Sequence, residues 1–275
     1  MRPFLASLLL AVMSLLPCRA GEAATGVDVS LVADTTAIVA GHPFTAALQV
    51  HHQEGYHTYW LSPGSVGVPF KIDWKLPPGF TAGPIQWPVP QQVKMAIHPA
   101  HGYERDVMLL VEITPPAKLD ASHITLEAKA SWMACYKGCY PGNRTLTLDL
   151  PAAETAAASA QADAIHRTRA EIPVPLAGWD ATVETAADAA EIRLKFTRQP
   201  GNSAAPAAPY FFSDDGQIAS EPPQRIEVLP DGFRVIAPRD EYGPKGRKTL
   251  TGVLRADGPL AEGKPAYATV SLSYL

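Results

Sequence analysis

Short runs in which apolar and polar residues alternate dominate this 275-residue chain, and prolines and glycines separate them. The 27 prolines and 20 glycines leave little room for long helices. In two of the runs every second residue is apolar: Ile124, Leu126, Ala128 and Ala130 in one, and Leu146, Leu148 and Leu150 in the other. Period-two patterning with turns every 8–15 residues predicts an all-β fold built as an antiparallel β-sandwich.

The pattern divides the chain into four segments. Residues 1–23 combine a basic start, a short apolar run and small residues, which is typical of a secretory signal peptide cleaved after Ala20 or Ala23. Residues 24–152 carry the first set of strands. The Ala-rich segment 153–174 predicts a helical linker, with its helix over 153–171. Strand patterns return over 175–275 as a second β-sandwich-like domain, in which "IEVLPDGFRVI" predicts a hairpin with Asp231-Gly232 at its turn.

The signal peptide predicts export to a compartment in which disulfides persist. Cys18 follows Pro17, a poor residue before a lipid-attachment cysteine. No second apolar stretch is long enough to span a membrane, so we expect no membrane span in the mature chain. The net charge of -4, without a basic cluster, makes nucleic acid an unfavourable partner.

Two cysteines remain after the signal peptide, Cys135 and Cys139 in "SWMACYKGCYPG". A hairpin with the loop 136–138 would bring them face to face, with Cα atoms 4.4–6.8 Å apart and Gly138 in the left-handed conformation. A helical turn would also bring them close enough to bond. The pair can therefore form a disulfide in either conformation.

As a structural staple this bond is weakly placed. Closing a five-residue loop stabilises a fold by roughly 2 kcal/mol, against almost 5 kcal/mol for a loop of 100 residues. With 47% hydrophobic residues the chain can bury a core without it. Redox use of the pair is therefore favoured over a structural role, and Lys137 in the loop would lower the pKa of a neighbouring thiol.

A metal site is the alternative use of the thiols. Zinc would need further ligands, whereas copper(I) accepts thiolates together with Met or His. The segment "KMAIHPAHGYERDVM" offers Met95, His98, His101 and Met108, which gives Cys135, Cys139, Met95 and His98 as the copper(I) candidates. The histidines of "HHQEGYHTYW", among them His57, fit a strand and a turn better than a ligand set. We expect no bound cofactor other than the disulfide itself.

Several segments resemble the periplasmic N-terminal (alpha) domain of the DsbD family of thiol:disulfide interchange proteins, and most of all its ScsB-type branch, which is associated with copper tolerance. The resemblance rests on "EGYHTYWLSPGSVGVPFKIDW", "GPIQWPVP", "GYERDVMLLVEITPP" and "ASWMACYKGCYPG". It covers about residues 27–150, and the cysteine segment is its most specific part. The segment "PYFFSDDGQI" resembles the second β region of ScsB-type N-terminal segments less specifically.

The resemblance implies that the protein is in the periplasm and that its first domain is an immunoglobulin-like domain that relays electrons through its cysteine pair. Cys139 would be the attacking thiol and Cys135 the resolving one. A cap loop over about Met95–Tyr103 would shield the pair, and the candidates for contact with the substrate are Met95, Ile97, His98, His101, Tyr103, Lys137 and Tyr140. The expected partners are thioredoxin-like periplasmic proteins, including those of cytochrome c biogenesis, and a separate membrane-bound DsbD-type reductase.

Overall fold

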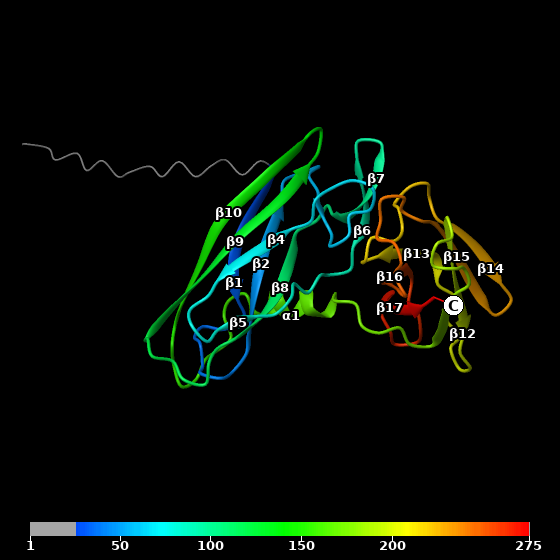
Figure 1. Cartoon of the computed structure of the whole chain (residues 1–275). Helices are drawn as coiled ribbons and strands as arrows, with labels where there is room; N and C mark the ends of the chain where they lie inside the picture. The colour runs from blue at the N-terminus through cyan, green and yellow to red at the C-terminus, as the bar shows by residue number, and fades with distance from the viewer. Residues whose placement is uncertain (1–25, 275) are drawn as a thin grey trace, which may run out of the picture.

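The structure is a computed structural model that describes residues 26–274 (Figure 1). The expected signal peptide and Cys18 lie outside these residues. All paired strands are antiparallel, and the predicted all-β, immunoglobulin-like class is confirmed. Among residues 26–274, no helix has the length and apolar character that crossing a membrane requires.

Three sheets form the first part of the chain, which we call the first domain. One sheet has the strand order β1 (Val27–Ala33), β2 (Phe44–His52), β8 (Val107–Thr114) and β5 (Thr81–Ala82). The second has the order β10 (Cys139–Pro151), β9 (His123–Cys135) and β4 (Lys71–Lys75). A small third sheet joins β3 (Thr58–Tyr59), β7 (His98–Tyr103) and β6 (Gln91–Met95).

The first two sheets enclose one apolar core. Leu126, Ala128 and Ala130 of β9 are fully buried in it, as their alternation predicts. On the paired strand β10, Leu146 and Leu150 point into the same core. The period-two pattern therefore identifies the core face of this long hairpin correctly.

The Ala-rich linker is only partly helical. Helix α1 spans Ala162–Ala170, with Arg167 and Arg169 in its last turn, so the expected helix over 153–171 is wrong in its first half. Residues 153–159 run instead as extended chain along residues 34–38, where Ala153 N donates to Ile38 O and Ser159 N donates to Asp34 O, both at 3.0 Å. These tertiary hydrogen bonds outweigh the high helix propensity of alanine.

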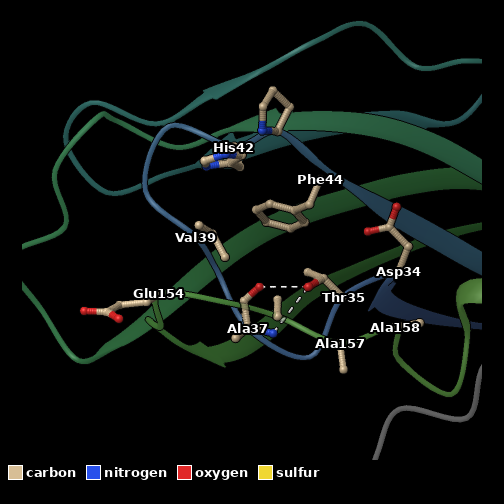
Figure 2. Close-up of a pocket in the computed structure, with 11 residues that line it drawn as sticks. Asp34, Thr35, Ala37, Val39, His42, Phe44, Glu154, Ala157 and Ala158 are labelled. Carbon is tan, nitrogen blue, oxygen red and sulfur yellow. Dashed lines mark hydrogen bonds between the residues drawn. The ribbon is translucent and has the colours of Figure 1, made fainter.

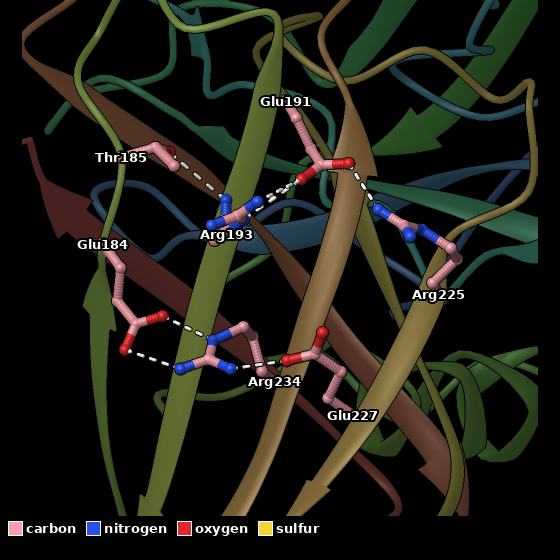
Figure 3. A network of polar contacts seen from close by, with 7 residues as sticks. All are labelled: Glu184, Thr185, Glu191, Arg193, Arg225, Glu227 and Arg234. Atoms are coloured by element: carbon pink, nitrogen blue, oxygen red, sulfur yellow. Dashed lines mark hydrogen bonds and ion pairs between the residues drawn. The ribbon is translucent and has the colours of Figure 1, made fainter.

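Two further sheets form the second domain. One has the order β11 (Trp179–Val183), β12 (Glu191–Arg198), β15 (Gly232–Pro238) and β14 (Arg225–Leu229), and the other has β13 (Ala207–Ser213), β16 (Thr249–Asp257) and β17 (Tyr267–Ser273). Figure 3 shows ion pairs linking arginines and glutamates on the exposed face of the first of these sheets: Glu184, Arg234 and Glu227 in one group, and Arg193, Glu191 and Arg225 in the other.

The predicted hairpin at residues 226–236 forms between β14 and β15, but its turn is one residue earlier than expected. Leu229 pairs with Gly232, so the loop is Pro230-Asp231 and Gly232 is the first residue of β15. A Cβ at Gly232 would lie 2.0 Å from the Phe196 carbonyl oxygen. This glycine allows the close approach of strand β12.

Candidate functional site

Cys135 and Cys139 form a disulfide at the end of the β9–β10 hairpin. The backbone N–H and C=O of Cys135 both bond to His57, at 3.0 and 2.9 Å, on the side away from Cys139. The two cysteines therefore face each other as a non-hydrogen-bonded pair, the narrower kind in an antiparallel ladder. Their Cα atoms are 4.2 Å apart, slightly less than the expected minimum of 4.4 Å.

The loop between the cysteines has the expected three residues, 136–138. Gly138 does not adopt the expected left-handed conformation, because its φ lies outside that region. Tyr136 N donates instead to Gly138 O at 3.0 Å, which closes the loop tightly. Lys137 places its ammonium 5.4 Å from the centre of the Tyr136 ring.

The two cysteines differ sharply in exposure. Cys135 is fully buried, whereas Cys139 is exposed. Cys135 packs in a small cluster with Tyr59, Val93 and Ala100, each at most 1% exposed. Attack from outside can therefore reach Cys139, with Cys135 as the sulfur that leaves.

A buried hydroxyl points at the sulfur of Cys135. Tyr59 donates its hydroxyl hydrogen to Cys135 Sγ at 3.1 Å, and His57 Nε2 lies 3.3 Å from the same hydroxyl oxygen. Burial raises the pKa of Tyr59 to about 12 and lowers the pKa of His57. Tyr59 therefore keeps its proton at neutral pH and acts as a donor, while a neutral His57 protonated on Nε2 donates to the tyrosine oxygen.

Sequence reasoning missed both residues. It assigned His57 to a strand and a turn, and it gave Tyr59 no role. The available signal was their i, i+2 spacing, which places both side chains on one face of an extended segment. Their connection to Cys135 spans 76 residues of sequence, and no local pattern reports it.

The segment expected to form the cap is an ordered hairpin of β6 and β7, with its turn at Ala96-Ile97. Val93 and Ala100 pack against Cys135, and Met95 packs at the margin of the same cluster. Ile97 at the tip is 85% exposed. The hairpin therefore covers the buried sulfur, and its tip faces solvent.

Three other cap candidates make contacts away from the disulfide. His98 Nδ1 lies 3.0 Å from Glu221 Oε1. His101 and Tyr103 are each 1% exposed, and Tyr103 donates its hydroxyl hydrogen to Pro88 O at 2.7 Å. His101 and Tyr103 are therefore inaccessible to a substrate in this structure, contrary to the expected contact role.

Three tyrosines cluster at the end of the β9–β10 hairpin. Tyr56 lies 5.6 Å from Tyr136 and 6.3 Å from Tyr140, measured between ring centres. Tyr136 and Tyr140 are 48% and 41% exposed. Together with Lys137 they form a partly apolar patch, and Tyr140, which pairs with Ala134, extends from the face of the hairpin opposite the two cysteines.

The copper(I) candidates are only partly brought together. Met95 packs at the margin of the cluster that contains Cys135, whereas His98 contacts Glu221. Met133, which the sequence did not single out, packs at the same margin as Met95. His101 lies in the contact with the second domain, and Met108 packs with Ile165 of helix α1 in another cluster. Within residues 26–274, no group of three or more His, Cys, Asp or Glu side chains is arranged to hold a metal ion.

A separate hollow of about 470 Å³ lies between the segment 34–44, which follows β1, and the segment 154–158 (Figure 2). Asp34, His42, Phe44 and Glu154 are among its lining residues. These segments follow the ends of β1 and β10, whereas the disulfide is at the start of β10. The hollow therefore belongs to the opposite end of the sandwich from the disulfide.

Comparisons with known proteins concern the family and the fold. Residues 28–151 match the family described as "Thiol:disulfide interchange protein DsbD, N-terminal". The crystal structure of the N-terminal periplasmic domain of ScsB from Proteus mirabilis is similar, with a TM-score of 0.65 and 19% identity, over 91% of this chain and 95% of that one. A collagen adhesin from S. aureus aligns with a TM-score of only 0.17 and 11% identity. No curated protein matches the sequence. Residues 28–151 are thus an N-terminal domain of the DsbD thiol:disulfide interchange family.

Proposed function

We propose that this protein is a periplasmic thiol–disulfide exchange protein that relays reducing equivalents to partner proteins through Cys135 and Cys139. The observation that carries the proposal is the asymmetry of the pair: Cys139 is exposed, while Cys135 is buried with a hydroxyl donor on its sulfur. A purely structural disulfide needs neither an exposed cysteine nor a hydrogen-bond donor to the sulfur of the buried cysteine. The match to the DsbD family supports the same reaction.

The reaction has two steps. In the reduced protein the Cys139 thiolate attacks a partner disulfide, which forms a mixed disulfide and releases one partner thiolate. The Cys135 thiolate then attacks Cys139 Sγ, so that the protein disulfide forms and the second partner thiolate leaves. The partner gains two electrons and the protein loses two.

The other half of the cycle restores the dithiol. A thiolate of a reductase attacks Cys139 Sγ, which forms a mixed disulfide, and Cys135 leaves as a thiolate that accepts the Tyr59 hydrogen bond. A second thiolate of the reductase then attacks the reductase sulfur of the mixed disulfide, so that Cys139 leaves as a thiolate and the reductase is left with a disulfide. We propose a separate membrane-bound DsbD-type protein as this reductase, and thioredoxin-like periplasmic proteins as the oxidised partners. The tyrosine patch at the end of the β9–β10 hairpin, close to the cysteines along the chain, supplies apolar contact area for docking.

Single-cysteine variants test the proposal, with a disulfide-bearing thioredoxin-fold protein as the probe. Cys135→Ser keeps the attacking thiol and should accumulate a mixed disulfide through Cys139. Cys139→Ser should neither form that adduct nor reduce the probe. Reduction of the probe by Cys139→Ser at the wild-type rate would contradict the assignment.

Copper(I) binding by the reduced protein is the second candidate function. The observation in its favour is that two thioethers, of Met95 and Met133, lie at the margin of the cluster around Cys135. Thiolate and thioether are the ligands that copper(I) prefers. The reduced protein should then retain copper(I) stoichiometrically, and a variant with both cysteines replaced by serine should not. Equal retention by this double variant would exclude the site.

A further inference from the structure

The β6–β7 hairpin has two faces with different neighbours. Val93 pairs with Ala100, and both side chains pack against Cys135. Gln92 pairs with His101 one position along, so these side chains lie on the other face. In Figure 1 the hairpin lies between the first domain and strands β13 and β16 of the second. One face thus covers the redox cysteine, and the other faces the second domain.

His101 joins the second face to strand β13. Its Nδ1 lies 3.2 Å from Ser62 O and its Nε2 lies 3.0 Å from the Tyr210 hydroxyl oxygen. A carbonyl oxygen can only accept, so Nδ1 carries the proton and Nε2 accepts from Tyr210. The His101 ring also meets the Phe212 ring edge to face, with centres 4.9 Å apart. The second domain therefore contacts β7 through a buried polar and aromatic junction.

Ser220 makes a second connection, nearer to the tip of the hairpin. Its hydroxyl donates to Pro99 O of β7 at 2.6 Å and accepts from Ser65 N at 3.0 Å, and the residue is only 3% exposed. A Cβ at Gly64 would lie 2.5 Å from Ser220 Cβ, so this loop approaches the serine closely. Next to Ser220, Glu221 contacts His98 at 3.0 Å. The second domain is thus hydrogen-bonded to the part of β7 that precedes Ala100.

We propose that the second domain determines which sulfur reacts, because Ser220 and Tyr210 hold the β6–β7 hairpin over Cys135. Both act as positioning residues, since neither touches the disulfide. With the hairpin held, an external thiolate or electrophile reaches only Cys139. With the hairpin loosened, Cys135 also becomes accessible, and mixed disulfides form at the wrong sulfur. This inference deepens the proposed exchange function by assigning its site selectivity to the second domain.

Site-resolved alkylation of the full-length reduced protein tests the proposal. Iodoacetamide labels both thiols, and mass spectrometry of the peptides gives one rate for each cysteine. In Ser220→Ala we expect the ratio of the Cys135 rate to the Cys139 rate to rise about tenfold, the factor that corresponds to the loss of one to two net hydrogen bonds. The Cys139 rate itself should not change. Tyr210→Phe should raise the ratio by a smaller factor.

Ser213→Ala is the matched control. Ser213 is also a buried serine of the second domain, with 1% of its surface exposed. Like that of Ser220, its hydroxyl donates one hydrogen bond and accepts one from a backbone N–H. Both of its partners, Asp215 and Gln217, however, lie in the second domain itself. The ratio should stay at the wild-type value in this variant. An unchanged ratio in Ser220→Ala, or an equal rise in Ser213→Ala, would overturn the proposal.

Two safeguards keep the result interpretable. If Ser220→Ala does not fold, Tyr210→Phe decides the question, because this substitution removes one hydroxyl and retains the ring. An unchanged ratio of the Cys135 rate to the Cys139 rate in Tyr210→Phe would then overturn the proposal. The alkylation ratio also does not depend on redox partners. An extremely low reduction potential would therefore contradict the proposed relay, while the effect of Ser220 on the ratio would still be measurable.

Discussion

Replacing Tyr59 by phenylalanine tests the chemistry of the buried sulfur most specifically. The substitution keeps the ring in the cluster around Cys135 and removes only the hydroxyl that donates to Cys135 Sγ at 3.1 Å. When Cys139 is attacked, Cys135 must leave as a thiolate at a site that is 0% exposed. Burial disfavours a thiolate, so the Tyr59 hydrogen bond should stabilise the charged form relative to the thiol.

The size of the effect follows from the strength of a hydrogen bond to a charged group. Such bonds contribute about 1.5–3 kcal/mol, and each pKa unit corresponds to about 1.36 kcal/mol. We therefore expect Tyr59→Phe to raise the pKa of the Cys135 thiol by about 1–2 units. If about half of the stabilisation is present in the transition state, reduction of the disulfide by a small thiol should slow by about 3- to 10-fold.

The thiol pKa is measured in a Cys139→Ser background, by thiolate absorbance or by the pH dependence of alkylation. Tyr103→Phe is the control, because Tyr103 is also a buried tyrosine whose hydroxyl donates a hydrogen bond, in this case to Pro88 O. It should change the stability of the fold and leave the pKa of Cys135 as it was. A Cys135 pKa and a reduction rate that are the same in Tyr59→Phe and wild type would refute this reasoning.

Three further predictions concern stability. Burial lowers the pKa of His101 to about 4, and the unfolded chain, with a histidine pKa near 6.5, therefore takes up this proton first. The contribution of His101 to the free energy of unfolding should fall by up to about 3 kcal/mol between pH 6.5 and pH 4. Urea titrations should show a pH dependence in His101→Gln that is weaker than in wild type by up to this amount, and an equal pH dependence would contradict it. Gly64→Ala should destabilise by about 1–3 kcal/mol, because φ is +88° and the new Cβ would meet Ser220; an unchanged denaturation midpoint would contradict this. Replacing both Cys135 and Cys139 by alanine should lower the free energy of unfolding by only about 2 kcal/mol, and a loss above about 4 kcal/mol would indicate a structural disulfide.

Much of the fold could be predicted from the sequence because it depends on local patterns. The alternation in β9 and β10 identifies the core face of each strand. The spacing of the cysteines predicts the disulfide, but it fits a helical turn as well as the hairpin that the structure shows. The expected helix over 153–171 was too long, since alanine content reports propensity alone. Pairing of residues 153–159 with residues 34–38 is a tertiary effect that no local window contains.

The candidate site divides in the same way. The isolation and spacing of Cys135 and Cys139 predicted that they can pair, and they form the disulfide; Met95, which was proposed from its place in the expected cap, packs at the margin of the cluster around Cys135. Tyr59 was missed, because it meets Cys135 across 76 residues of sequence. Contacts of the second domain with the hairpin were missed for the same reason: Ser220 lies 121 residues from Pro99. Such contacts depend on how the two domains pack, which sequence periodicity does not encode.

The reduction potential of the Cys135–Cys139 pair tests the central claim most directly. The purified protein is equilibrated in thiol redox buffers of known potential and then alkylated. Mass spectrometry gives the fraction of protein that carries the disulfide at each potential. A relay predicts a value of roughly -180 to -270 mV, the range of known exchange proteins. A value below about -300 mV would mark a structural bond and contradict the proposed function.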